Sequence, residues 1–398
     1  MAISDTGKDC FVVSLLAMTK EKGNNMQTPI EFHKKLRGKT VITSKAKLDA
    51  DNLQLAYTPG VGEASMAIVH DKALLSELTG RQNSVAIITD GSAVLGLGNI
   101  GPEAALPVME GKAAIFAQFA GVNAVPICLD TQDTEEIIKT VKHISPAFGG
   151  INLEDIAAPH CFEVERRLSA ELDIPVFHDD QHGTAIVVLA GLINALKVVG
   201  KQKENIKVVI SGAGAAGIAI SELLYDYGIT NYCLCDSKGV INEHRENLNK
   251  YKTKALAESI GSCPIGNCAL ALHGADVLIG VSQPGQFTAD DIRQMNEKPI
   301  VFALANPIPE IMPEEALAGG AAVVATGRND FPNQVNNALV FPGLFRGLLD
   351  NHVKTITSEI KIAVAEALAR LIEKPTAEDI IPSIFDKRVV PAIVASIK

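Results

Sequence analysis

The second half of the chain alternates apolar runs with segments of helical spacing. The runs are rich in β-branched residues, and helical patterns separate them. Continuous apolar runs arranged in this way are typical of parallel strands that are buried on both faces. This half is therefore predicted to form a doubly wound α/β sheet. Its expected strands are IKVVIS (206–211), NYCLC (231–235), DVLIGVS (276–282), PIVFALA (299–305) and AAVVATG (321–327).

The first half also has an α/β pattern, and two long helices are expected after the second sheet, packing back on the fold. The stretch IPVFHDDQHGTA (174–185) lies near the expected domain boundary, and clefts between domains are preferred ligand sites. The expected strands are 84–90, 124–130 and 174–177, and the expected C-terminal helices are 354–372 and 385–397. The expected domains are an N-terminal extension (1–26), an N-terminal α/β domain (27–175) and a doubly wound domain with the C-terminal helices (176–398).

Composition and charge narrow the possible partners and location. The 398 residues include 36 Lys and Arg against 46 Asp and Glu, a net charge of −10, which argues against nucleic acid and anionic membranes as partners. Most of the seven cysteines lie in apolar runs and none forms a C-x-x-C pair, as for buried thiols in a reducing cytosol, so a zinc site is not expected. The run 11–18 lacks the pattern of a signal peptide, and the apolar stretch 185–196 is too short to cross a bilayer. We expect a soluble, cytoplasmic protein.

A glycine-rich loop follows the expected strand at 206–211. SGAGAAG places Gly212, Gly214 and Gly217 between that strand and an apolar helix, and Asp236 stands 19 residues after Gly217. In a dinucleotide fold the glycines let the backbone approach the pyrophosphate, the helix N-terminus offers N–H groups, and the acid meets the ribose. The alternative is a tight turn without a ligand. We predict a Rossmann-like site that binds NAD or NADP and includes the intervening Ala215 and Ala216.

The same glycine pattern occurs a second time, at Gly96, Gly98 and Gly101, but its context differs. No acid follows at the required distance, and Pro102 and Pro107 are expected to break the helix that should come next. This loop is therefore predicted to be a flexible substrate-side loop or a structural turn.

Acidic pairs follow two of the apolar segments. Glu154 and Asp155 end INLED, and Asp179 and Asp180 follow IPVFH. Adjacent carboxylates at the end of a buried strand repel each other unless a cation or a hydrogen-bond network compensates them. Glu154, Asp155 and Asp180 would suit Mg²⁺ or Mn²⁺, which prefer hard oxygen ligands, although a polar loop fits the spacing equally well. His178 and His182 in HDDQH do not have a known zinc spacing.

A lysine is expected on a buried helix face. Val108, Ile115 and Phe116 stand four residues before, three after and four after Lys112, so they share its face. Such a lysine extends its ammonium to solvent, pairs with a carboxylate, or loses its proton more easily. The third possibility would make Lys112 a general base with a lowered pKa.

Taken together, the motifs of this chain resemble the short prokaryotic type of malic enzyme. The resemblance runs from about Pro29 to the C-terminus. Members of this family oxidatively decarboxylate L-malate to pyruvate and CO₂ with NAD⁺ or NADP⁺ and a divalent metal, and they are usually homodimers or larger homo-oligomers. The motifs, in chain order, are YTPGV, GLGNIG, MEGKA, INLEDI, FHDDQHGTA, SGAGAAG, CDSKG, ANPIPE and NNALVFPG.

The resemblance assigns roles to residues that alone would pass as turn or loop residues. It implies Tyr57 as the general acid, Lys112 as the general base, and Asp179 as the residue that holds Lys112. Tyr57 and Lys112 would also contact the substrate. The other implied residues are Glu154, Asp155 and Asp180 for the metal, Asn306 and Asn337 for the substrate, and Ser282, Asn306 and Asn336 for the cofactor.

Some choices stay open at the level of sequence. Larger eukaryotic members carry an arginine where this chain has Ala93, so the group that binds the malate carboxylate is open. Arg328 is a candidate to replace that arginine. Asp236 slightly favours NAD⁺, whereas the nearby Lys238 and Arg245 could neutralise the 2′-phosphate of NADP⁺. The alternative functions are a malolactic-type lyase with tightly bound NAD and a non-catalytic nucleotide sensor. Residues 1–26 match no pattern that we recognise.

Overall fold

The computed structural model describes residues 28–398. Internal contacts divide the chain into a unit that ends at Thr43 and a unit from Ser44 to Lys398. The first unit contains α2 (Pro29–Leu36), which begins with a capping box between Thr28 and Glu31. The expected extension, residues 1–26, lies outside the described residues.

The first sheet has four parallel strands in the order β2-β1-β3-β4. The sequence predicted β1, β2 and β4 but not β3, because its four residues, GINL, form too short an apolar run. Since β4 pairs with β3, this sheet extends through His178, three residues beyond the boundary expected after residue 175. The strands are β1 (Ser84–Thr89), β2 (Asn123–Cys128), β3 (Gly150–Leu153) and β4 (Val176–His178), and the helices beside them are α6 (Pro102–Ala120), α7 (Thr134–Ile144) and α8 (His160–Glu171).

Helix α6 begins at Pro102 and runs through Pro107, the two prolines that were expected to break it. Pro102 stands in the first turn, where its missing N–H has no helical partner to lose. Pro107 lies inside the helix, which continues to Ala120. The buried face with Met109, Lys112 and Phe116 anchors α6 against the sheet, so tertiary packing outweighs the local cost of Pro107.

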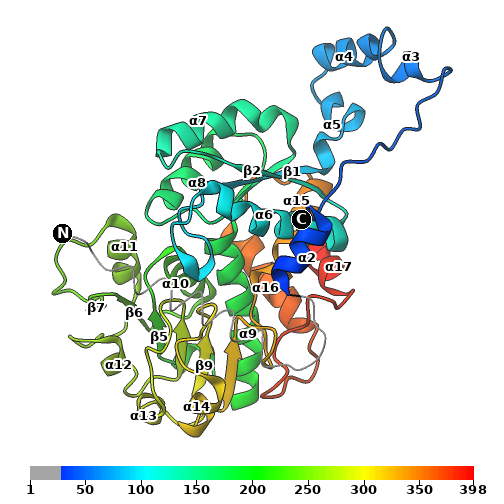
Figure 1. The fold of residues 1–398 in the computed structure, drawn as a ribbon. Helices are drawn as coiled ribbons and strands as arrows, with labels where there is room; N and C mark the ends of the chain where they lie inside the picture. Colours follow the sequence, from blue (N-terminus) through cyan, green and yellow to red (C-terminus); the bar gives the residue numbers. More distant parts are fainter. Residues whose placement is uncertain (1–27) are drawn as a thin grey trace. The chain divides into compact units, whose positions relative to one another are not determined.

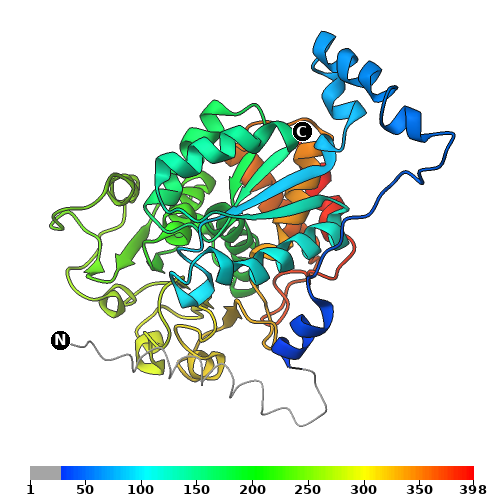
Figure 2. The ribbon, with the colours of Figure 1, turned by 45° about the horizontal axis from the view of Figure 1, so that its top comes forward.

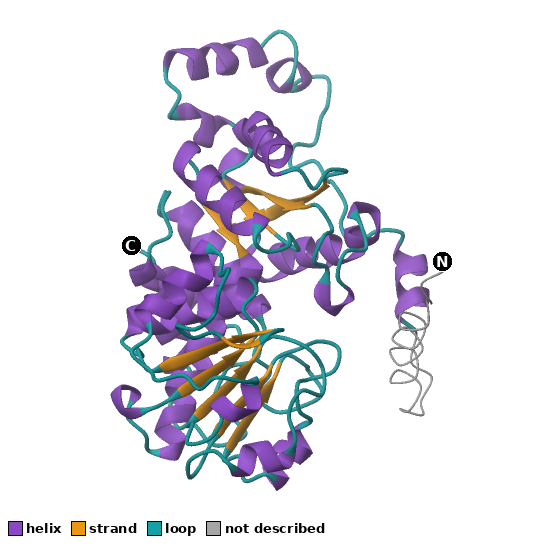
Figure 3. Cartoon of the chain, turned by 90° about the vertical axis from the view of Figure 1, so that its left-hand side faces the viewer, coloured by secondary structure: helices purple, strands orange, loops and turns teal. Residues whose placement is uncertain are grey.

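The second sheet has the order β10-β9-β8-β5-β6-β7, and only the short β7 is antiparallel. Figure 3 shows the two sheets as separate groups of strands. The predicted α/β class, with a doubly wound Rossmann-like sheet, is confirmed. The strands are β5 (Val208–Ser211), β6 (Tyr232–Asp236), β7 (Gly239–Val240), β8 (Val277–Gly280), β9 (Ile300–Ala303) and β10 (Val323–Thr326), and the helices among them are α10 (Ala215–Tyr227), α11 (Lys250–Glu258), α12 (Cys268–Ala271), α13 (Ala289–Arg293) and α14 (Pro313–Ala318).

Helix α9 (Thr184–Val199) connects the two sheets, and the C-terminal helices pack back as expected. The apolar segment Asp179–Val199 is long enough to cross a membrane, but 72% of its most apolar window is buried inside the fold, which marks a core helix. Phe345 of α15 contacts Phe116 of α6 and Phe177 of β4, at ring-centroid distances of 5.5 and 6.1 Å. Figure 2 shows the C-terminal helices, in orange and red, beside the first sheet. The C-terminal helices are α15 (Phe341–Asp350), α16 (Ser358–Arg370) and α17 (Val389–Ser396).

Three short helices before the first sheet contain no buried residue. Figure 1 shows this segment standing away from the sheet of β1 and β2. Several of its apolar side chains are exposed, with Leu55 at 70% and Val69 at 71% of their full accessible surface. We call α3 (Leu53–Ala56), α4 (Val61–His70) and α5 (Leu74–Leu78) the N-terminal arm.

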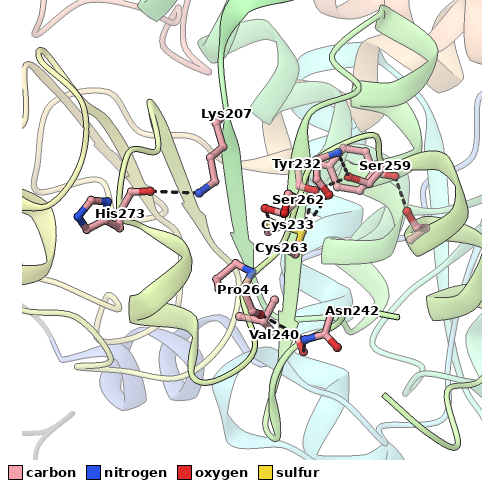
Figure 4. The surroundings of a disulfide bond; sticks show 12 residues. Lys207, Tyr232, Cys233, Val240, Asn242, Ser259, Ser262, Cys263, Pro264 and His273 are labelled. Atoms are coloured by element: carbon pink, nitrogen blue, oxygen red, sulfur yellow. Dashed lines mark hydrogen bonds between the residues drawn. A yellow bond between two sulfur atoms is a disulfide. The ribbon is translucent and has the colours of Figure 1, made fainter. Parts of the chain in front are cut away.

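A disulfide joins Cys233 of β6 to Cys263 (Figure 4). The expectation that the cysteines are reduced thiols is therefore wrong for this pair, which lies close in space although 30 residues apart in sequence. Cys235 and Cys268 are free, and the hydrogen bond between them, followed by burial, raises the pKa of the Cys235 thiol.

Candidate active site

A cavity of about 840 Å³ lies where the first sheet, α6 and the glycine loop of the second sheet meet. Lys112, Glu154, Asp155 and Asp180 line one part of it. Gly214, Ala215 and Ala216 of the glycine loop line another part. The expectation of a ligand site near residues 174–185 agrees with this arrangement, because Asp180 and Thr184 belong to the lining.

The carboxylates predicted to bind metal are brought together. Glu154 and Asp155 follow β3, and Asp180 lies in the π-helical turn η4 (Asp179–Gly183), which follows β4. Since β3 and β4 are parallel neighbours, their carboxyl ends meet at the same edge of the sheet. One oxygen from each of the three carboxylates lies within 4.8 Å of the others.

The electrostatics of this group call for a cation. Burial, followed by mutual repulsion of the carboxylates, raises the pKa of Asp155 to about 9 and that of Glu154 to about 7. Burial together with the charge of Asp179 raises the pKa of Asp180 to about 6. Asp155 Oδ2 is buried without a hydrogen-bond partner among the described residues. A clustered set of hard, partly unpaired oxygens fits Mg²⁺ or Mn²⁺.

Lys112 points from α6 into this cluster and pairs with two carboxylates instead of reaching solvent. Only 6% of its surface is exposed. Its Nζ donates hydrogen bonds to Asp179 Oδ2 and to Glu154 Oε2, the latter at 2.5 Å. Burial by itself would lower the pKa of Lys112, but the charges of Asp179, Glu154 and Asp180 raise it above its ordinary value. Of the three possibilities that the sequence left open for Lys112, the structure shows the pairing with carboxylates.

The glycine loop has the geometry expected of a dinucleotide site. It connects β5 to α10, which begins at Ala215, so the first N–H groups of α10 face the cavity lined by Gly214. A Cβ on Gly217 would lie 1.7 Å from the carbonyl oxygen of Gly212, so only glycine allows this close approach. Gly212 has a φ of +113°, which also favours glycine.

Asp236 lies at the end of β6, as predicted, but two basic side chains already bind it. Arg245 Nη2 donates to both carboxylate oxygens at 3.0 Å, and Lys252 Nζ donates to Oδ2 at 2.7 Å. Burial would raise the pKa of Asp236, but the bonds from Lys252, Lys238 N–H and Arg245 lower it. Lys238 itself contributes its backbone N–H, at 2.9 Å. The sequence suggested Arg245 but missed Lys252.

The remaining predicted residues divide into two groups. Ser282, Asn306, Asn336 and Asn337 line the cavity, together with Ala93 and Gly96 of the second glycine loop. Arg328 does not belong to the lining: its guanidinium donates to both Asp330 oxygens, at 2.9 and 2.6 Å, and to the Pro307 carbonyl at 2.8 Å. Arg328 is thus already held by other groups.

Tyr57 is not brought to the cavity by its own chain. It lies between α3 and α4 of the N-terminal arm, with 69% of its surface exposed, and it is absent from the described residues that line the cavity. The sequence therefore identifies a motif that the structure does not place in the lining of the cavity.

Sequence analysis missed two buried acids that support the site. Glu310 accepts hydrogen bonds from the N–H groups of Ser282 (2.7 Å) and Ala305 (3.0 Å), which fixes two loops of the cavity wall. Glu165 of α8 binds the turn η4 from behind. Its position on the buried face of α8, four residues after Cys161 and three before Leu168, is a signal that could have revealed it.

Comparison with known proteins places this site in a family. Residues 36–169 match the profile of the malic enzyme N-terminal domain, and residues 181–397 match the malic enzyme NAD binding domain. The chain is 53% identical to a bifunctional malic/malolactic enzyme of Bacillus subtilis, over 92% of this chain and 91% of that protein. It is 52% identical to an NAD-dependent malic enzyme of Geobacillus stearothermophilus, over 89% of this chain and 75% of that protein.

A solved structure agrees with the sequence relatives. The NAD-dependent malic enzyme from Thermotoga maritima superimposes with a TM-score of 0.90 at 46% identity, covering 94% of this chain and 99% of that chain. The order of motifs, the carboxylate cluster beside Lys112 and these matches all agree, and the chain belongs to the malic enzyme family.

Proposed function

We propose that the protein catalyses the oxidative decarboxylation of L-malate to pyruvate and CO₂ with reduction of NAD⁺ or NADP⁺. The observation that carries this proposal is the placement of Lys112 and the three carboxylates in one cavity with the glycine loop. A dicarboxylate that enters this cavity meets a base, a set of metal ligands and the dinucleotide loop at once. A nucleotide sensor would need no such set of groups.

The side chains divide the chemistry between them. A divalent cation held by Glu154, Asp155 and Asp180 would offset their charge and polarise the C2 oxygen of malate. With the cation bound, burial would favour the neutral amine of Lys112, which would take the C2 hydroxyl proton; the nicotinamide would supply the hydride acceptor. Asp179 holds Lys112 at this position. The C2 carbonyl accepts the electron pair released with CO₂, and the resulting enolate needs a proton at C3, the role of Tyr57.

Tyr57 reaches a cavity, in this proposal, by crossing to a second subunit. The support is the N-terminal arm, which carries Tyr57 together with exposed Leu55, Met66 and Val69 and has no buried residue. Apolar side chains on a segment of this kind are typical of an interface between copies. The enzyme would thus be a homodimer, or a larger assembly built from it, in which each arm completes the partner's site.

Mixing two inactive variants tests the crossing of Tyr57. Tyr57→Phe and Lys112→Ala each remove one group from every site, so either variant alone should be nearly inactive. After mixing and reassembly, a hybrid dimer contains one site with both native groups, and activity should return to roughly a quarter of the wild-type level. Absence of any recovery, with hybrid dimers demonstrated by mass spectrometry, would mean that Tyr57 serves its own subunit.

For the cofactor, we propose a slight preference for NAD⁺ with acceptance of NADP⁺. Asp236 can accept the ribose hydroxyls, whereas Arg245 and Lys252 supply positive charge where a 2′-phosphate would approach.

Malate-dependent reduction of both cofactors, with and without Mn²⁺, tests the proposed reaction. No reduction of either cofactor with Mn²⁺ present would refute it.

A second candidate activity is malolactic conversion of malate to lactate with NAD kept bound. The observation in its favour is the 53% identity to a bifunctional malic/malolactic enzyme. Parallel measurement of released NADH, pyruvate and lactate distinguishes the two activities.

Two further expectations stay predictions. The protein should bind neither nucleic acid nor membranes, which pull-down can test, and it should be cytoplasmic, which cell fractionation can test.

A further inference from the structure

Glu165 is a buried carboxylate that does not line the cavity, yet it binds η4, the turn that carries Asp179 and Asp180. Its Oε1 accepts the backbone N–H of His178 at 2.8 Å. Its Oε2 accepts Gln181 Nε2 and pairs with His182 Nε2, both at 3.0 Å. These three residues surround Asp179 and Asp180 in the sequence, so a single carboxylate holds both ends of η4.

The network continues to the C-terminal helix α16. Lys361 Nζ lies 3.0 Å from His182 Nδ1. Because an ammonium can only donate, Nδ1 of His182 accepts and Nε2 carries the proton that is donated to Glu165. Burial would raise the pKa of Glu165, but His182, His178 and Lys361 lower it to about 2, so Glu165 is a carboxylate at neutral pH.

We propose that Glu165 is a positioning residue for the metal site. Holding η4 from behind sets Asp180 against Glu154 and Asp155, and sets Asp179 against Lys112. Residues that orient metal ligands without touching the metal typically change metal affinity or activity by roughly 10–100-fold when they are replaced. The inference rests on the proposed function, because it presumes that these carboxylates bind a divalent cation.

The test measures Mn²⁺ binding directly, by the electron paramagnetic resonance signal of free Mn²⁺ in a titration of the full-length protein. The variant Glu165→Gln keeps the shape of the side chain, but its amide presents an N–H₂ to groups that are themselves donors. Mn²⁺ should bind roughly 10–100-fold more weakly than to the wild type, with NAD⁺ affinity unchanged. The matched control is Glu163→Gln on the same helix, whose carboxylate pairs with Arg166 and not with η4. Its Mn²⁺ affinity should equal that of the wild type.

Lys361→Met provides a second variant in case Glu165→Gln does not fold. It leaves Glu165 in place but removes the donor to His182 Nδ1, so Mn²⁺ affinity should fall several-fold, again without a change for NAD⁺. Wild-type Mn²⁺ affinity in the folded variants overturns the inference. An equal loss of Mn²⁺ and NAD⁺ affinity also overturns it, since that indicates a general structural role. Failure of the wild type to bind Mn²⁺ would instead refute the proposed metal site itself.

Discussion

At the scale of the residue, the charged neighbours of Lys112 and of Asp236 shift the pKa of each side chain. Lys112 is buried among carboxylates, which hold its proton. Asp236 is flanked by Arg245 and Lys252, which offset the charge that would otherwise repel a 2′-phosphate. The sequence identified both residues through their motifs. The family resemblance implied Asp179 as the partner of Lys112, and the sequence suggested Arg245 beside Asp236. Lys252 was missed, because it comes close to Asp236 only through the fold.

The pairing of Asp236 predicts how a cofactor variant behaves. Arg245→Ala removes the guanidinium whose Nη2 donates to both oxygens of Asp236, so the carboxylate should repel a 2′-phosphate more strongly. The kcat/KM for NADP⁺ should fall by roughly tenfold or more, about 1.4 kcal/mol, while the value for NAD⁺ changes little. Steady-state kinetics with both cofactors measure this ratio. Equal losses with NAD⁺ and NADP⁺ would show that Arg245 does not contribute to the choice.

At the scale of the element, the strand–turn–helix segment from β4 through η4 to α9 is the part that sequence predicted least completely. The apolar strand and helix were evident from their patterns, and the family resemblance assigned roles to the acidic pair between them. The π-helical turn η4 was not predicted, because the side chains that bind it, Glu165 of α8 and Lys361 of α16, are distant in sequence. Strand β3 was missed for a simpler reason, its length of four residues.

The disulfide between β6 and the loop before α12 predicts a stability difference. Cys263→Ser opens a covalent loop with a sequence separation of 30 residues, which should cost roughly 3–4 kcal/mol in the chain-entropy estimate. Thermal unfolding without reductant should show a lower Tm for the variant than for the wild type, and a reductant should remove most of that difference. Identical unfolding curves without reductant would mean that Cys233 and Cys263 are not bonded in solution.

At the scale of the whole molecule, the buried carboxylates affect the stability of the fold. The pKa of Asp155 is raised to about 9 in the folded chain, so between its ordinary value and pH 9 the folded state binds more protons than the unfolded state. The free energy of unfolding therefore falls as pH rises through this window. His178, whose pKa burial lowers to about 4, affects stability in the opposite direction but only below its ordinary value of 6.5.

Between pH 7 and 9 the metal-free protein should consequently lose stability, and Asp155→Asn should lose less. Urea unfolding in the presence of a chelator, at several pH values, measures both slopes. Equal slopes for the two proteins would contradict the raised pKa of Asp155. The comparison between variants is the informative quantity, because other groups that titrate in this range are common to both proteins.

The central claim is that Glu154, Asp155 and Asp180 form a divalent-metal site that supports malate oxidation. Asp180→Asn keeps the shape of the side chain and removes its charge, which a hard cation requires. The most direct measurement is malate-dependent NADH formation by this variant and the wild type across a range of Mn²⁺ concentrations, with NAD⁺ affinity measured alongside. The variant should lose metal-dependent turnover while binding NAD⁺ normally. Equal turnover of the two proteins at every Mn²⁺ concentration would contradict the claim.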